Sequence, residues 1–296
     1  MYHEETDTPC IPKTWNISDD LGQIEYIFSD KTGTLTQNVM EYRKCTINGV
    51  SYGLGTTEAT LGALKRQQSH HHQEKETEAG LNMQEFIQDD LIGNDQLEQY
   101  KQEMFAKQAQ LYENKYIGPN PTFVDPKLFD DLAQDTKQAM AIAHFYQTLA
   151  LCHTVIAERP DKSNPNYIEY KAQSPDEAAL VATARDLGFV FLGRESNKLL
   201  VCIKGEKKEF ELLNVLEFNS TRKRMSVIIK PKDSDRIVLL CKGADSVIYE
   251  RLCMDFGDQK DLESEQLTLR DATARDLEMF ANEGKNILLV FFKQKT

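Results

Sequence analysis

The sequence predicts a mixed α/β fold, and three observations support this prediction. A short apolar run at residues 24–28 is rich in β-branched and aromatic side chains, which is typical of a buried strand. Strand-sized segments joined by short polar turns recur between residues 167 and 292, which indicates a mostly antiparallel sheet. Helical patterns at 135–155, 174–187 and 262–283 could cover that sheet. We therefore expect a first strand followed by an α+β domain.

Length and composition restrict the classes of protein to which the chain can belong. Its 296 residues are enough for two domains with cores of their own. The formal net charge of -12 argues against a nucleic-acid partner, because a phosphate backbone would be repelled. The 6 cysteines form no Cys-x-x-Cys pair, and no signal-peptide pattern is present, which together indicate reduced thiols in the cytosol. No apolar run approaches the roughly 18 residues that a membrane-spanning helix needs.

The predicted first strand leads into a loop, Ser29–Thr36, that suits phosphoryl transfer. Asp30 would lie at the carboxyl end of the strand, where open α/β sheets bind their ligands. Gly33 permits a sharp turn close to a phosphate, and a carboxylate at this place can attack a phosphoryl group as a nucleophile. A simple phosphatase needs an acid two residues after the nucleophile. Thr32 cannot act as one, so we expect an aspartyl-phosphate that persists.

The next segments differ in regularity. Residues 1–23 are polar and read as an irregular lead-in, whereas residues 40–51 alternate in part and turn at Asn48-Gly49, which is typical of a β-hairpin. Residues 56–135 form a polar insertion. We expect it to hold a mobile loop to about residue 82 and one or two surface helices between residues 83 and 116. The adjacent His70, His71 and His72 fit a loop better than a metal site, because neighbouring histidines do not converge on one ion.

The second half alternates strands with helices. The apolar helix at 135–155 carries His144 and His153, which we interpret as core or rim residues. After it we expect strands at 167–172, 189–192, 199–203, 208–218, 224–230, 236–242 and 287–292, and helices at 174–187, 244–252 and 262–283.

Three strings in this half stand out chemically. In Lys171–Leu180, Ser174 suits a helix N-cap, Pro175 the first helical position, and Glu177 the reciprocal position of a capping box. In Glu217–Ser226, Phe218 ends a strand before a basic turn, so its ring could stack on a base. In Cys241–Ser246, Lys242 ends a buried strand and therefore needs a partner for its ammonium group. No Walker-type or kinase glycine loop is present.

The string Asp30-Lys31-Thr32-Gly33-Thr34-Leu35-Thr36 closely resembles the phosphorylation signature of P-type ATPases, and residues 17–28 resemble the type IV branch, the phospholipid flippases. This resemblance implies that residues 1–39 are a lead-in and the start of a Rossmann-like, haloacid-dehalogenase-type phosphorylation domain. It implies that residues 40–285, with the 56–135 insertion, form an inserted nucleotide-binding domain. Residues 286–296 would be a return strand or an altered C-terminus.

The resemblance also implies two ligands, ATP and Mg²⁺. ATP would be held in the nucleotide-binding domain, with Glu177 facing the adenine edge, Phe218 stacking on the ring and Lys242 lining the pocket. Weaker candidates for the same site are Arg224, Ser226 and Gly243. Magnesium would bridge the γ-phosphate and Asp30, with the Thr32 carbonyl as a further ligand. Lys31 and Thr34 would stabilise the charge on the transferring group.

The implied function is ATP-dependent phospholipid translocation through an aspartyl-phosphate, with this chain as the cytosolic, ATP-binding and phosphorylated part of an integral membrane protein. Phospholipid and an accessory subunit would be its partners, and the organelle stays open. Two alternatives remain: a nucleotide-binding or regulatory fragment without catalysis, and a soluble haloacid-dehalogenase-type phosphatase, against which Thr32 argues. The sequence departs from the family's pattern after Glu283-Gly284. The family has an Arg a few residues after this Glu-Gly pair, whereas this chain has only Lys285, which could replace the charge of the Arg but not its bidentate geometry.

Overall fold

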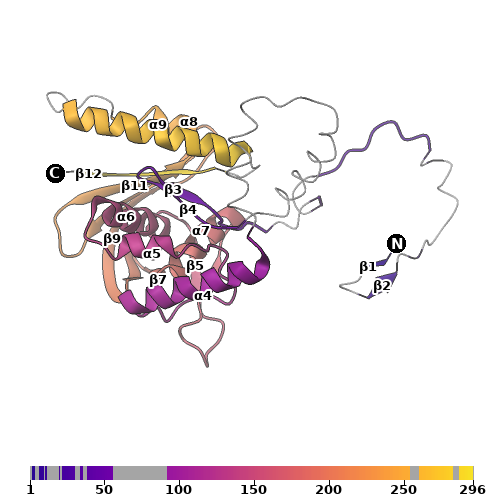
Figure 1. The fold of residues 1–296 in the computed structure, drawn as a ribbon, viewed down its shortest axis with the longest axis horizontal. Coiled ribbons are helices and arrows are strands. Elements are labelled where there is room, and N and C mark those ends of the chain that lie inside the picture. Colours follow the sequence, from indigo (N-terminus) through magenta and orange to yellow (C-terminus); the bar gives the residue numbers. More distant parts are fainter. Residues whose placement is uncertain are drawn as a thin grey trace. The chain divides into compact units, whose positions relative to one another are not determined.

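The computed structural model describes residues 2–3, 7–9, 11, 20, 22–30, 34–35, 39–55, 92–253, 260–282 and 287–295 (Figure 1). The chain divides into two compact units, unit 1 (Met1–Val39) and unit 2 (Met40–Thr296). The predicted mobile loop and the run His70–His72 fall outside the described residues. The assignment of the two units to a phosphorylation domain and a nucleotide-binding domain stays a prediction.

Unit 1 has little regular structure in its described part. Strands β1 (Tyr2–His3) and β2 (Thr8–Pro9) pair antiparallel. The expected buried strand at 24–28 does not form: these residues are irregular, and Ile27 and Phe28 are 87% and 96% exposed. No described strand pairs with this segment, so its backbone groups lack the neighbouring strands that a buried strand requires.

Unit 2 is built on a six-stranded antiparallel sheet, which confirms the predicted α/β class and strand pairing. Its spatial order is β12-β11-β10-β9-β8-β7, so each strand pairs with its neighbour in the sequence. The strands are β7 (Phe189–Glu195), β8 (Lys198–Ile203), β9 (Glu206–Leu216), β10 (Arg224–Pro231), β11 (Ile237–Gly243) and β12 (Leu289–Lys295). Short turns join the consecutive strands from β7 to β11, whereas residues 244–288 separate β11 from β12.

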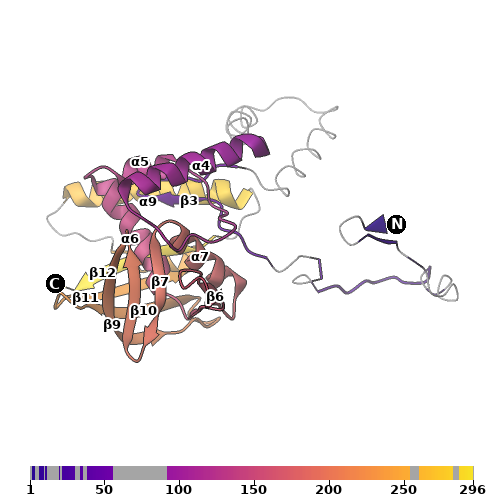
Figure 2. The ribbon, with the colours of Figure 1, turned by 90° about the horizontal axis from the view of Figure 1, so that it is seen from below.

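Helix α6 (Lys137–Leu151) forms the centre of the core. The Thr136 side chain caps it by accepting a hydrogen bond from the Ala139 N–H. The helix contacts β8 and β11 and also both edge strands, β7 and β12, so the sheet curls around it (Figure 2). Its buried side chains, which include Ile142, Tyr146 and Leu149, join one hydrophobic cluster with residues of the sheet. The predicted apolar helix at 135–155 is therefore confirmed as a buried element.

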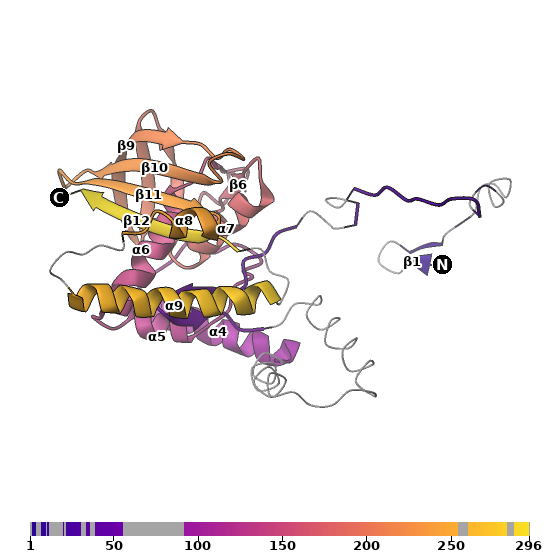
Figure 3. The same cartoon turned by 90° about the horizontal axis from the view of Figure 1, so that it is seen from above.

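The predicted hairpin is also confirmed. Strands β3 (Cys45–Ile47) and β4 (Val50–Tyr52) pair antiparallel around Asn48 and Gly49, whose φ angles are 52° and 76°. Positive φ at both central residues is typical of a type I′ turn. Helix α9 (Lys260–Asn282) packs against β3, where the Thr46 hydroxyl donates a hydrogen bond to Asp276 (Figure 3).

The remaining elements are α4 (Asn94–Leu111), α5 (Lys127–Leu132), β5 (Ile156–Glu158), β6 (Glu169–Lys171), α7 (Pro175–Asp186) and α8 (Asp245–Tyr249). Strand β6 lies within the strand expected at 167–172 and pairs antiparallel with β5, for which no strand was expected. Among the described helices, none combines the length and hydropathy of a membrane span.

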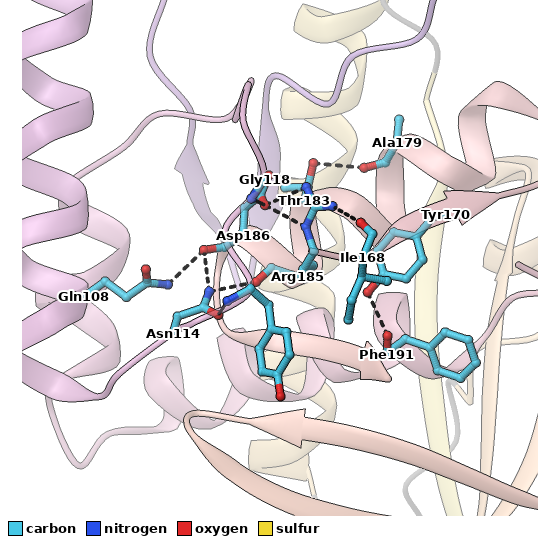
Figure 4. A network of polar contacts seen from close by, with 11 residues as sticks. Gln108, Asn114, Gly118, Ile168, Tyr170, Ala179, Thr183, Arg185, Asp186 and Phe191 are labelled. Atoms are coloured by element: carbon cyan, nitrogen blue, oxygen red, sulfur yellow. Dashed lines mark hydrogen bonds and ion pairs between the residues drawn. The ribbon is translucent and has the colours of Figure 1, made fainter. Parts of the chain in front are cut away.

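A buried polar network anchors the C-terminal end of α7 (Figure 4). Arg185 donates to Asp186 through Nε (2.9 Å) and Nη2 (2.8 Å) and to the Ile168 carbonyl through Nη1 (2.9 Å). Asp186 also accepts the Gly118 N–H at 2.8 Å, and its own carbonyl accepts from Gln108 of α4 at 2.9 Å. These partners come from α4, from the loop between α4 and α5, and from Ile168, which directly precedes β6. The network therefore fixes α7 against three neighbouring segments.

Candidate functional site

The structure brings Glu177 and Lys242 together, although they lie 65 residues apart in the sequence. Glu177 lies in the first turn of α7, and Lys242 near the end of β11. Lys242 Nζ lies 3.2 Å from Glu177 Oε1, and the two side chains are only 9% and 12% exposed. The ammonium group at the end of the buried strand thus has the partner that its burial requires.

Thr154 completes this pair from the turn after α6. Its backbone N–H donates to Glu177 Oε1 at 3.1 Å, and its hydroxyl donates to Oε2 at 2.8 Å. Sequence reasoning missed Thr154, because nothing in its own segment signals a partner 23 residues away.

The predicted capping box is wrong. Ser174 is the N-cap of α7, but its side chain makes no capping hydrogen bond. The Glu177 carboxylate instead contacts Lys242 and Thr154. The charged ammonium group and the two Thr154 donors stabilise the carboxylate more than a single hydrogen bond from the N-cap N–H would. Burial by itself would raise the pKa of Glu177. The Lys242 charge and the Thr154 hydrogen bonds outweigh this and hold the pKa below its ordinary value, so the carboxylate is ionised at neutral pH.

Phe218 lies just beyond the end of β9 and is 63% exposed. The turn that follows is well ordered by local contacts: Arg222 donates its N–H to Asn219 Oδ1 at 2.7 Å and its guanidinium to the Glu217 carbonyl at 2.8 Å. The same turn touches the end of β11, where the Ala244 N–H donates to the Lys223 carbonyl at 3.0 Å. The exposed ring and the basic turn therefore lie at the sheet end that carries Lys242.

Arg224 and Ser226, at the start of β10, have different surroundings. Arg224 is half-buried and donates to the Arg222 carbonyl at 3.0 Å. Ser226 is buried and lies 3.3 Å from Cys241 Sγ, its cross-strand partner. Side chains alternate across a sheet, and Met225 is the residue opposite Lys242. Ser226 therefore faces away from the side of the sheet on which Lys242 lies, and the structure does not bring these two together.

Gly243 allows a close approach, but of the neighbouring strand. A Cβ at this position would lie 2.5 Å from Arg224 Cβ and 2.6 Å from the Lys223 carbonyl oxygen. The absence of a side chain thus lets β10 and its preceding turn pack against the end of β11.

A cavity of about 1000 Å³ has Thr154, the hydrogen-bond partner of Glu177, in its wall. Its walls include His153, Thr154 and Glu217, together with apolar residues of the sheet such as Leu212 and Val227. Glu177, Phe218 and Lys242 are not among its walls, so the cavity adjoins the site through Thr154 and Glu217. Burial lowers the pKa of His153 to about 4, so the imidazole in the cavity wall is neutral.

The predicted phosphorylation residues lie in unit 1. Asp30 and Thr34 are exposed, and the Ser29 hydroxyl donates to the Asp30 carbonyl at 3.1 Å. Lys31, Thr32 and Gly33 lie outside the described residues. An exposed carboxylate such as that of Asp30 is accessible to a nucleotide phosphate and to a hard cation, and the roles expected of it stay predictions.

Comparison with known proteins identifies the family of the chain. The family model described as P-type ATPase, cytoplasmic domain N, matches residues 141–293, just over half of the chain. The chain is 47% identical over its full length to phospholipid-transporting ATPase DNF2 of Saccharomyces cerevisiae, and 47% identical over 98% of its length to DNF1 of Chaetomium thermophilum. It is 35% identical over 99% of its length to human phospholipid-transporting ATPase IC.

The chain spans 17–19% of the length of these curated relatives. The match to the family model extends from the middle of α6 to β12 and so includes Glu177, Phe218 and Lys242. The chain therefore belongs to the P-type ATPases, in the type IV branch that includes these relatives, which are named phospholipid-transporting ATPases.

Proposed function

We propose that unit 2 binds ATP beside the Glu177–Lys242 pair. The observation that carries the proposal is the buried ion pair next to an exposed aromatic ring and a basic turn, at one end of the curled sheet. Phe218 stacks on the adenine ring, Glu177 accepts a hydrogen bond from the base, and Lys242 lines the path of the phosphates. The 63% exposure of Phe218 leaves its ring free to lose water when a base covers it.

The relatives' names and the loop Ser29–Thr36 support the larger proposal, that the whole protein is a phospholipid-transporting ATPase. A carboxylate oxygen of Asp30 attacks the γ-phosphorus of ATP, the bond to the β,γ-bridging oxygen breaks, and ADP leaves with that electron pair. Lys31 and Thr34 stabilise charge on the transferring phosphoryl group. Mg²⁺, held by Asp30 and the Thr32 carbonyl, supplies charge neutralisation when bound. The phospholipid moves in response to this cycle.

ATP binding is tested on the 296-residue chain by isothermal titration with a non-hydrolysable ATP analogue. Phe218→Ala and Lys242→Met should each weaken binding about tenfold or more, since a stacked ring or a phosphate contact contributes more than about 1.4 kcal/mol. Matched controls are Met140→Ala, an exposed apolar residue of α6, and Lys198→Met, an exposed lysine of β8. Unchanged affinity in both site variants would contradict the proposal.

Phosphorylation is tested on the full-length protein with γ-labelled ATP. Asp30→Asn should abolish the acid-stable label, because an amide cannot form the acyl-phosphate. Asp20→Asn, a second exposed carboxylate of unit 1, should label like the wild type. Normal labelling of Asp30→Asn would refute the role of Asp30 as the nucleophile.

A further inference from the structure

Thr154 holds the Glu177 carboxylate by both of its oxygens. The backbone N–H reaches Oε1 (3.1 Å) and the hydroxyl reaches Oε2 (2.8 Å), whereas Lys242 reaches only Oε1 (3.2 Å). An ammonium group on a flexible four-carbon stem attracts the carboxylate but does not set its plane. Two donors from one residue, aimed at different oxygens, do set it. The orientation of Glu177 is therefore determined by Thr154.

The turn that presents Thr154 is itself rigid. The ring of His153 spans it: Nδ1 accepts the Val155 N–H at 3.1 Å, so Nε2 carries the proton and donates to the Ala150 carbonyl at 2.9 Å. The same ring packs edge-on against Phe191 of β7, with centroids 4.4 Å apart. His153 and Val155, on either side of Thr154, are both buried. The position of the Thr154 hydroxyl thus follows from the packing of α6 and the sheet.

The contacts leave Glu177 with little remaining capacity. An ionised carboxylate has about four acceptor positions. Thr154 and Lys242 use two positions on Oε1, and the Thr154 hydroxyl uses one on Oε2. One acceptor position on Oε2 remains, and its direction is set by the Thr154 hydroxyl. Adenine carries an amino group at C6 and is complementary to this acceptor. Guanine bound in the same pose would instead place its C6 carbonyl, an acceptor, against an acceptor.

We propose that Thr154 is a positioning residue for base recognition: its hydroxyl directs the last free acceptor of Glu177 at the amino group of the nucleotide base and so favours ATP over GTP. This inference rests on the proposed ATP site. It assigns the choice between the two bases to a residue outside the strings Lys171–Leu180, Glu217–Ser226 and Cys241–Ser246.

The test compares Thr154→Val, which removes the hydroxyl but keeps the shape and the backbone N–H, with Thr154→Ser, which keeps the hydroxyl. Affinities for ATP and GTP are measured by isothermal titration on the 296-residue chain, and thermal stability is measured in parallel. Thr154→Val should lower the ratio of ATP to GTP affinity about tenfold, and Thr154→Ser should retain the wild-type ratio. The matched control is Thr183→Val, because the Thr183 hydroxyl bonds within α7 to the Ala179 carbonyl (3.0 Å) and does not touch Glu177.

The outcomes separate this inference from the function on which it rests. If Phe218→Ala and Lys242→Met bind ATP normally, the proposed site itself is wrong. If they bind ATP weakly but Thr154→Val keeps the wild-type ratio, the site stands and the role of Thr154 is refuted. Equal affinity of the wild-type chain for ATP and GTP would also refute it. An equal fall in the ratio of ATP to GTP affinity in Thr154→Val and Thr154→Ser would refute the role of Thr154 as well, because that result indicates a purely structural residue.

Discussion

Replacing Asp186 with asparagine tests how α7, the helix that carries Glu177, is held in unit 2. Asp186 and Arg185 are 6% and 8% exposed, and the carboxylate accepts from the guanidinium twice and from the Gly118 N–H. Removing one partner of a buried pair costs about 3–5 kcal/mol, because the other charge is left buried without compensation. We expect Asp186→Asn to destabilise the chain by about this amount.

The destabilisation by Asp186→Asn has two possible sources, the lost carboxylate charge and the Arg185 charge that is left without a partner. Burial raises the pKa of Asp186 above its ordinary value in spite of the adjacent Arg185 guanidinium, so ionised Asp186 itself contributes little to the stability of the folded state. The destabilisation should therefore come chiefly from the uncompensated Arg185. Adding Arg185→Met to Asp186→Asn should then recover part of the stability, although the double variant carries more changes.

The assay is urea unfolding followed by far-UV circular dichroism. The free energy of unfolding falls with urea concentration by about 3 kcal/mol/M, so a loss of about 3–5 kcal/mol lowers the midpoint by about 1–1.7 M. Asp161→Asn is the control, since Asp161 is exposed and bonds only within its own turn. A midpoint for Asp186→Asn equal to that of Asp161→Asn, or a double variant less stable than Asp186→Asn, would refute the reasoning.

Two further predictions concern the same unit. Gly118→Ala should lower the melting temperature by about 4 °C or more, because the new Cβ would lie 1.9 Å from Arg185 Nη2. The control is Gly93→Ala, which should change the melting temperature much less, because no atom lies within 4 Å of the new Cβ. Equal shifts of the two variants in differential scanning fluorimetry would contradict this prediction. His153 has a folded-state pKa of about 4 against an ordinary value of 6.5, so its contribution to stability is present above pH 6.5 and is lost as the pH falls towards 4. The loss is about 3 kcal/mol, and urea midpoints across this range should fall less steeply in His153→Gln; parallel pH profiles would count against it.

Much of the architecture follows from local sequence signals. Asn48-Gly49 predicts its hairpin because the requirement for positive φ is met within two residues. The strands between residues 189 and 243 pair with their sequence neighbours, so short turns and apolar segments are sufficient to indicate their order in the sheet. The pairing of β12 with β11 spans residues 244–288 and does not follow from a short turn. The string Asp30–Thr36 and the segments around Glu177, Phe218 and Lys242 likewise carry the family resemblance without any knowledge of the fold.

The strand expected at 24–28 shows the limit of such signals. Its apolar pattern is appropriate for a buried strand, but a pattern does not supply partners, and no described strand pairs with it. The capping box at Ser174 and Glu177 shows the same limit in a side chain. The local pattern is present, but the Glu177 carboxylate binds the Lys242 ammonium group and two donors of Thr154 in place of the N-cap N–H.

By itself, the sequence of this protein determined its family, its α/β class and the need of Lys242 for a partner, since each of these depends on residues close together along the chain. Only the tertiary structure decided that this partner is Glu177, that Thr154 orients it, and that Ser226 faces away from them. The physical reason is that a buried charge interacts with whatever folding places beside it. For Lys242 that neighbour is 65 residues away, beyond the reach of any local pattern.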